Sequence, residues 1–156
     1  MIEIKVPGRC DYELENIVFD YNGTIAINGK IDPLIKEKIS TLSNMANVYV
    51  LTADTYGSAA KECDGLDLTL KTFPKDNAAE YKAKIVNELG KDKTICFGNG
   101  YNDIKMFEIA VLSVAVLEKE GMCSALIKES DIMVKSIEDG INLLLNPKAM
   151  IATLRG

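Results

Sequence analysis

The chain has 156 residues, the size of one compact domain, and 47% of them are hydrophobic. The net charge is −5 and Lys and Arg form no cluster, so we expect no nucleic-acid partner. The chain contains no histidine, which excludes Ser-His-Asp and Cys-His catalysis, and none of its four cysteines forms a Cys-x-x-Cys pair for zinc. No apolar run approaches the roughly 18 residues that cross a bilayer, so we expect a cytoplasmic protein without a membrane partner.

Strands and helices are predicted in alternation along the chain. Alternating or continuous apolar residues predict strands at 1–6, 14–20, 48–51, 67–70, 94–97, 111–116 and 132–134. Helical spacing predicts helices at 33–43, 56–62, 75–89, 104–110, 122–128 and 137–145, and one or two further turns within 148–156.

Turn and capping residues set the predicted boundaries. Asn28-Gly29 within 24–31 predicts a two-residue hairpin turn. Asp32 is the expected N-cap of the helix that Pro33 begins, and Gly90 is the expected C-cap of the helix at 75–89.

This alternation predicts right-handed β-α-β units and therefore a parallel sheet with helices on both faces. The expected fold is α/β, a three-layer doubly wound parallel sheet, in a single domain spanning residues 1–156. Ligands bind at the carboxyl ends of the strands in such sheets, so these ends are where chemistry is expected.

Three of the predicted strands end in polar residues that do not suit a core. Turns after strands also favour such residues, so any one segment alone is ambiguous. Three together on neighbouring strands indicate a site. The segments are Asp20-Tyr21-Asn22-Gly23-Thr24, Thr52-Ala53-Asp54 and Gly98-Asn99-Gly100-Tyr101-Asn102-Asp103.

A carboxylate at a buried strand end can attack phosphorus and form an aspartyl-phosphate. Asp20 and Asp103 can supply the two carboxylates that Mg²⁺ commonly uses, and a lysine can offset the remaining repulsion. Backbone N–H groups around Gly23, with the Thr24 and Thr52 hydroxyls, could hold phosphate oxygens.

These segments resemble, in order, the motifs of the haloacid dehalogenase superfamily over about residues 14–145. The first motif is an apolar strand ending in Asp-x-Asp-Gly-Thr, the second a strand ending in Thr or Ser, and the fourth Gly-Asp-Gly-x-Asn-Asp. The third is a lysine on the preceding helix. Lys82 matches best, and Lys84 and Lys75 are weaker candidates.

Within the superfamily the chain looks like a soluble P-type ATPase. The segment from Leu51 to Asp54 is similar to the Leu-Thr-Gly-Asp segment of those enzymes. The stretch 102–107 is similar to phosphoserine phosphatases.

The resemblance implies a role for each matching residue. Asp20 would be the nucleophile and a Mg²⁺ ligand, and Asn22 would offer its backbone carbonyl to the metal. Asn99 and Asp103 would ligate the metal or stand behind its ligands.

The same resemblance implies a phosphoryl-binding set. Thr52, Ala53 and Lys82 would hold the phosphoryl group, with Gly23 and Thr24 beside them. Asp54 would support the metal site or its loop.

Two residues depart from the family pattern. Phosphatases of this family carry Asp at the position of Asn22, where it serves as the general acid and base. An amide cannot transfer that proton, and such help is worth about 10²–10⁴-fold in rate. Asn99 replaces a metal-binding Asp, which predicts weaker Mg²⁺ affinity. Slow turnover or a persistent phospho-Asp20 is therefore expected.

Neither interval between the motifs has room for a cap domain, so we expect an open site. It would suit a phosphorylated small molecule, a phosphoprotein, or a homo-oligomer in which a neighbour covers it. Met150 and Ile151 in the tail could make such a contact or could pack within their own chain.

The leading functional hypothesis is a slow Mg²⁺-dependent phosphohydrolase that acts through phospho-Asp20. ATP-dependent self-phosphorylation ranks lower, because neither a P-loop nor a nucleotide domain is visible. The third hypothesis is a degenerate, regulatory or phosphate-binding protein on the same fold.

Overall fold

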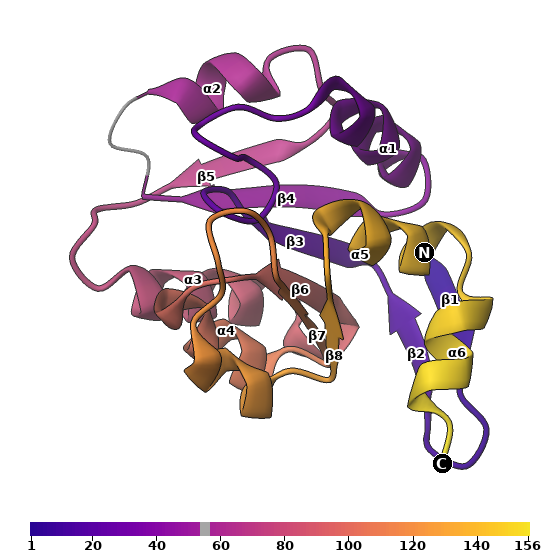
Figure 1. The fold of residues 1–156 in the computed structure, drawn as a ribbon. Coiled ribbons are helices and arrows are strands. Elements are labelled where there is room, and N and C mark those ends of the chain that lie inside the picture. The colour runs from indigo at the N-terminus through magenta and orange to yellow at the C-terminus, as the bar shows by residue number, and fades with distance from the viewer. Residues whose placement is uncertain (54–56) are drawn as a thin grey trace.

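The computed structural model describes residues 1–53 and 57–156, and it is built around a six-stranded parallel sheet (Figure 1). The strand order is β5-β4-β3-β6-β7-β8, so the chain runs outward from β3 to β5 and then returns to β6 on the other side. This order confirms the doubly wound α/β fold. The strands are β3 (Asn16–Asp20), β4 (Asn47–Thr52), β5 (Thr69–Thr72), β6 (Thr94–Gly98), β7 (Leu112–Val116) and β8 (Ile132–Val134).

Helices cover both faces of this sheet (Figure 1). On one face lie α1 (Pro33–Ser43), α2 (Ser58–Cys63) and α5 (Ile137–Leu145), and on the other lie α3 (Ala78–Leu89) and α4 (Ile104–Ile109). In the described part of the chain, three short 3₁₀ helices complete the connections: η1 (Lys91–Lys93), η2 (Tyr101–Asp103) and η3 (Ser124–Glu129). Among the described residues, no helix is long and apolar enough to cross a membrane.

The central strands are buried on both faces, as their continuous apolar runs predict. Every residue of β3, β6 and β7 is buried. Phe19 belongs to the core under α1 and α5, whereas its neighbour Val18 belongs to the core under α3 and α4. The rings of Phe19 and Phe97 lie 4.9 Å apart and link β3 to β6. This rigid centre fixes the position of Asp20 at its edge.

The chain begins with a hairpin that stands apart from the main sheet. β1 (Ile2–Lys5) pairs antiparallel with β2 (Asp11–Leu14), a strand that the sequence analysis missed. The C-terminal helix α6 (Lys148–Leu154) lies beside this hairpin, and the Gly156 N–H donates to the Pro7 carbonyl. Met150 on α6 is fully buried within its own chain, which corrects the alternative in which it contacts a neighbour.

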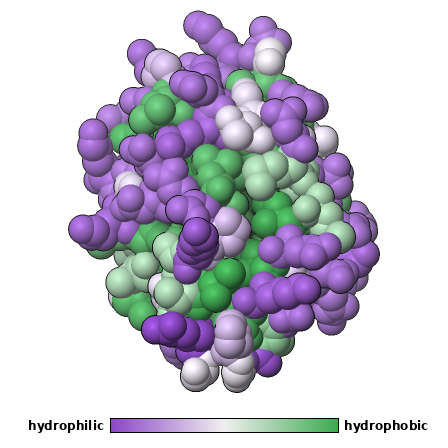
Figure 2. Space-filling view, turned by 90° about the vertical axis from the view of Figure 1, so that its right-hand side faces the viewer, coloured by the Kyte–Doolittle hydropathy of each residue, from purple (hydrophilic) through white to green (hydrophobic). Residues whose placement is uncertain are grey.

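The face that carries α6 and the hairpin is of mixed polarity. Figure 2 shows hydrophobic side chains along the middle of this face and hydrophilic ones around them. Partly buried residues of α5 and α6 pack against the main core from this side, namely Leu143, Leu145 and Ile151. The hairpin and α6 therefore extend the core beyond the β-α-β units that the alternation predicts.

Several predicted boundaries are shifted. The helix expected at 75–89 begins at Ala78, because Asn77 adopts a left-handed backbone with φ 64°; its C-cap Gly90 is confirmed. The strand expected at 67–70 lies at Thr69–Thr72, and the helix expected at 122–128 is the 3₁₀ helix η3. The helix expected at 56–62 begins at Ser58, and residues 54–56 lie outside the described part.

The segment between β3 and α1 forms a folded loop over the edge of the sheet. Asn28 and Gly29 both have positive φ, which confirms the predicted turn, but the pairing around it is limited to isolated bridges. The Tyr21 hydroxyl donates to the Gly29 carbonyl at 2.9 Å and holds the turn. Asp32 caps α1 by accepting from the Leu34 N–H at 2.8 Å, as predicted.

Candidate active site

The strand order brings the predicted segments to one place. β3 lies between β4 and β6, and all three strands point the same way, so Asp20, Thr52 and the Gly98 loop share one edge of the sheet. A cavity of about 410 Å³ opens there. Its lining residues are Asp20, Asn22, Thr52, Ala53, Lys82, Asn99, Gly100, Tyr101 and Asn102.

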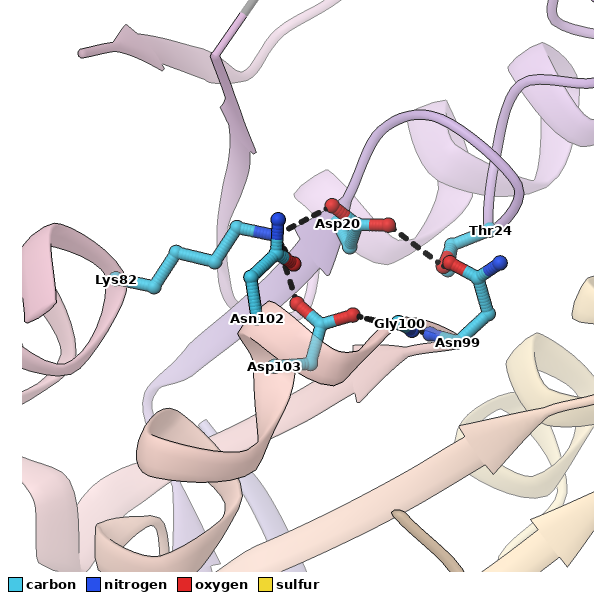
Figure 3. Close-up of polar contacts among 7 residues, drawn as sticks. All are labelled: Asp20, Thr24, Lys82, Asn99, Gly100, Asn102 and Asp103. Carbon is cyan, nitrogen blue, oxygen red and sulfur yellow. Dashed lines mark hydrogen bonds and ion pairs between the residues drawn. The ribbon is translucent and has the colours of Figure 1, made fainter. Parts of the chain in front are cut away.

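Lys82 is the lysine that reaches this site. It lies on the buried face of α3 with Ala78 and Val86, and only 1% of it is exposed. Its Nζ is 2.6 Å from Asp20 Oδ1 and 2.7 Å from Asp103 Oδ1 (Figure 3). The weaker candidates, Lys84 and Lys75, are exposed.

Asp103 anchors the loop that follows β6. It is fully buried, and its Oδ2 accepts from the Asn99 N–H at 3.1 Å and the Gly100 N–H at 2.9 Å. Its Oδ1 accepts from Lys82. Both oxygens therefore contact protein donors, and direct metal ligation by Asp103 stays a prediction.

The Thr24 hydroxyl lies between the second carboxylate oxygen of Asp20 and the side chain of Asn99 (Figure 3). Thr24 Oγ1 lies 3.1 Å from Asp20 Oδ2 and 3.2 Å from Asn99 Oδ1. A hydroxyl has a single proton, so it can donate to only one of these acceptors at a time. The Asn99 amide is oriented by its Nδ2, which donates to the Gly121 carbonyl at 3.0 Å.

This donor set fits a hard cation such as Mg²⁺. Asp20 Oδ2 and Asn99 Oδ1 are both oxygens with spare lone pairs, the ligand type that Mg²⁺ prefers. No group of three or more acidic, Cys or His side chains that could hold a metal occurs within 1–53 and 57–156. A cation here would depend on few carboxylates and on neutral oxygens. Asp54, which was expected to support the metal site, lies outside the described residues.

The buried charges of the site are unbalanced. Asp20 and Asp103 carry two negative charges against the single positive charge of Lys82. Burial, with a further contribution from Asp103, raises the pKa of Asp20 to about 6, although Lys82 opposes the shift. Burial lowers the pKa of Lys82, but the two carboxylates outweigh it and the net shift is upward. An added cation would balance the remaining negative charge.

The loop after Asp20 differs from expectation in one respect. The Gly23 N–H donates to the Ala26 carbonyl and the Thr24 N–H to the Tyr21 carbonyl, so neither is a free donor for phosphate. Gly23 matters for another reason: its φ is 79°, and a Cβ there would lie 2.3 Å from Asn99 Nδ2.

The structure adds a residue that the sequence analysis gave no role: Asn102 Oδ1 accepts from Lys82 at 3.0 Å. The place of Tyr101 beside motif residues predicts that it either lines the mouth of the site or packs, and it lines the cavity. Gly98 allows Asp103 to approach, because a Cβ there would lie 2.4 Å from Asp103 Oδ2. Asn102 and Gly98 both lie in the fourth motif, so their place in it was the available signal.

Comparison with known proteins is consistent with this geometry. Two uncharacterized proteins of Methanocaldococcus jannaschii are similar in sequence. One is 44% identical over 78 residues, which are 47% of this chain and 84% of that protein. The other is 49% identical over 39 residues, 25% of this chain and 89% of that protein.

Solved phosphatase structures share the fold. The cobalt-bound deoxy-D-mannose-octulosonate 8-phosphate phosphatase of Haemophilus influenzae superimposes with a TM-score of 0.71 at 12% identity, over 92% of this chain and 94% of that one. The 3-deoxy-D-manno-octulosonate 8-phosphate phosphatase of Moraxella catarrhalis, in complex with magnesium, phosphate and its sugar, gives 0.70 at 15%, over 91% and 94%. At these identities the likeness concerns the fold alone.

A family model gives the decisive match. The haloacid dehalogenase-like hydrolase family matches residues 40–142, about two thirds of the chain. That span contains Thr52, Lys82, Asn99 and Asp103. With the shared fold and the order of the motifs, and with no cap domain among residues 1–53 and 57–156, the match shows that this chain belongs to the haloacid dehalogenase-like hydrolases.

Proposed function

We propose that the chain is a Mg²⁺-dependent phosphohydrolase that takes the phosphoryl group onto Asp20. One observation carries this proposal: a buried carboxylate at the end of the central strand touches a buried lysine and opens into a 410 Å³ cavity. The phosphatases with the same fold bind magnesium, cobalt or phosphate, as their structures record.

In the proposed reaction a carboxylate oxygen of Asp20 attacks phosphorus and the bond to the leaving oxygen breaks. Lys82 donates to one carboxylate oxygen of Asp20, and it offsets the negative charge of that carboxylate as the phosphate dianion approaches. Thr52 and Ala53, at the end of β4, line the same cavity and can hold the phosphoryl oxygens. Mg²⁺ on Asp20, Asn99 and the Asn22 carbonyl would supply further positive charge.

Proton transfer is the weak step of this site. Asn22 is exposed and lines the cavity at the position where the family has its general acid and base. Its amide can neither donate the proton that the leaving group needs nor accept one from water. Of the two carboxylates described at the site, Asp20 is the nucleophile and Asp103 is held by three donors. We therefore propose that phospho-Asp20 accumulates, and that substrates with good leaving groups react fastest.

The substrate proposal follows from the openness of the site. No cap lies between β3 and α1, or within the described residues between β4 and α3, so a phosphorylated small molecule or a phosphoprotein could enter. Cover by a second copy of the chain remains a proposal, and its test is the oligomeric state in solution.

The test is the mass of the intact protein after incubation with Mg²⁺ and acetyl phosphate, alongside phosphate release from p-nitrophenyl phosphate. We expect the added mass of one phosphoryl group and slow Mg²⁺-dependent release. Asp20→Asn should abolish both signals, whereas Asp64→Asn, a change at an exposed turn residue, should leave both unchanged. Normal turnover by Asp20→Asn would overturn the proposal.

Asn22 and Asn99 also favour a second candidate, a phosphate-binding or regulatory protein that has lost catalysis. Asn22→Asp separates the two. In a latent enzyme it should raise turnover by about 10²-fold, because a proton shuttle is restored. A chain whose site has decayed further would bind phosphate but gain no turnover.

A further inference from the structure

One aromatic side chain at the cavity has no structural reason for its exposure. Tyr101 lines the cavity and is 73% exposed. Among the described residues, Tyr81 is the other exposed aromatic side chain, and its ring is stacked on Phe73 with the ring centres 5.7 Å apart. In the part of the chain that the structure describes, no aromatic ring stacks on Tyr101.

The backbone around Tyr101 is nevertheless fixed by the site. The Asp103 N–H donates to the Gly100 carbonyl at 3.1 Å, and the Gly100 N–H donates back to the Asp103 carboxylate at 2.9 Å. The next residue, Asn102, contacts Lys82. Tyr101 is therefore held at a set position beside the phosphoryl-binding residues, where it lines the cavity and is largely exposed.

Four residues further along the chain, Lys105 forms an ion pair with Glu80. An exposed aromatic side chain favours stacking by a flat group.

We infer that Tyr101 determines specificity, and that the substrate is a phosphate monoester whose leaving group carries a flat ring, of the nucleobase or aryl class. The ring would stack on Tyr101 while the phosphate lies against Asp20 and Lys82. Hydrolysis of this ester rests on the proposed function, whereas binding of its flat ring by Tyr101 does not.

The test uses two esters that differ only in the flat group. Adenosine 5′-monophosphate and ribose 5-phosphate both carry the phosphate on a primary 5′ oxygen, and attack at phosphorus breaks the same P–O bond in each, so their leaving alcohols have similar chemistry. We expect kcat/KM to be at least about tenfold higher for the nucleotide, the scale of base stacking on an aromatic residue. Tyr101→Ala should bring this ratio close to one, and Tyr101→Phe should keep it. Tyr81→Leu is the matched control and should leave the ratio unchanged.

Binding separates this inference from the proposed reaction. Calorimetric titration of the Asp20→Asn protein with the same two esters measures affinity without turnover. If the wild type hydrolyses neither ester but the nucleotide still binds about tenfold tighter, and loses that advantage in Tyr101→Ala, the reaction fails and the stacking stands. Equal affinities, or a preference that survives Tyr101→Ala, would overturn the role of Tyr101 whatever the turnover.

Discussion

Gly98→Ala tests the packing on which the site depends. Gly98 ends β6, and a Cβ on it would lie 2.4 Å from Asp103 Oδ2 and 2.5 Å from Asp103 Cγ. Real carbon and oxygen atoms do not approach so closely, so one group must move. Asp103 cannot turn aside cheaply, because its carboxylate is buried and accepts from Lys82 and from two backbone N–H groups.

The size of the effect follows from those bonds. A hydrogen bond to a charged acceptor contributes about 1.5–3 kcal/mol, so weakening both backbone bonds should lower the free energy of unfolding by about 3–5 kcal/mol. The displaced carboxylate would also release Lys82 from its position. A misplacement of about 1 Å can cost 10²-fold in rate, and we expect a loss of that order in kcat/KM.

Gly100→Ala is the matched control two residues away. A Cβ there would meet Asn102 Oδ1 at 3.5 Å and Asp103 Oδ2 at 3.6 Å, which are ordinary contacts, and the backbone φ of −107° suits alanine. Its free energy of unfolding should change by less than about 1 kcal/mol. Urea unfolding and phosphate release from p-nitrophenyl phosphate measure both variants. If Gly98→Ala matches the wild type in both assays, the close approach of Asp103 to β6 is not what holds the site.

Three further outcomes are expected. Lys82→Met leaves two buried carboxylates without their cation and should lower the free energy of unfolding by about 3–5 kcal/mol at neutral pH. The control Lys84→Met changes an exposed lysine and should alter the free energy of unfolding by less than about 0.5 kcal/mol. Equal urea midpoints for the two variants would contradict the buried ion pairs. Because the pKa of Asp20 is raised to about 6, its contribution to stability without metal is present at low pH and is lost as the pH rises through 6. Mg²⁺ needs the ionised carboxylate, so the increase in Tm on adding Mg²⁺ should grow across the same window, and an increase independent of pH would argue against Asp20 as a ligand. Tyr21→Phe removes the hydrogen bond to the Gly29 carbonyl and should cost about 1 kcal/mol in urea unfolding, with no change if the hydroxyl is equally well hydrated in the folded and unfolded chains.

The order of the elements could be predicted because local patterns decide it. A continuous apolar run such as Ile17–Phe19 is stable only where both faces are covered, and β3 is buried throughout. The N-cap at Asp32 and the C-cap at Gly90 act through their own neighbours, so their positions are correct. The shift of α3 to Ala78 depends on a left-handed backbone at Asn77, which helical spacing does not report.

The second strand of the N-terminal hairpin could not be predicted, because α6, which shares its core, is distant in sequence. Asp11–Leu14 pairs with Ile2–Lys5, and the buried face of this hairpin shares a core with Met150 and Leu154 of α6. The spacing of Met150 fits either an internal contact or a contact with a neighbour. Only the folded chain shows that it is internal.

By itself the sequence determined the family, the fold class and the residue types of the site, since motifs and apolar runs are local properties. The tertiary structure decided which side chains meet. Sheet order places β4 and β6 on either side of β3, and the phase of α3 turns Lys82 inward while Lys84 faces solvent. The structure also shows that the Asp103 carboxylate accepts hydrogen bonds from Lys82 and from two backbone N–H groups, and that Tyr101 lines the cavity. These contacts join segments from β3, α3 and the loop after β6, and no local pattern encodes the distance between them.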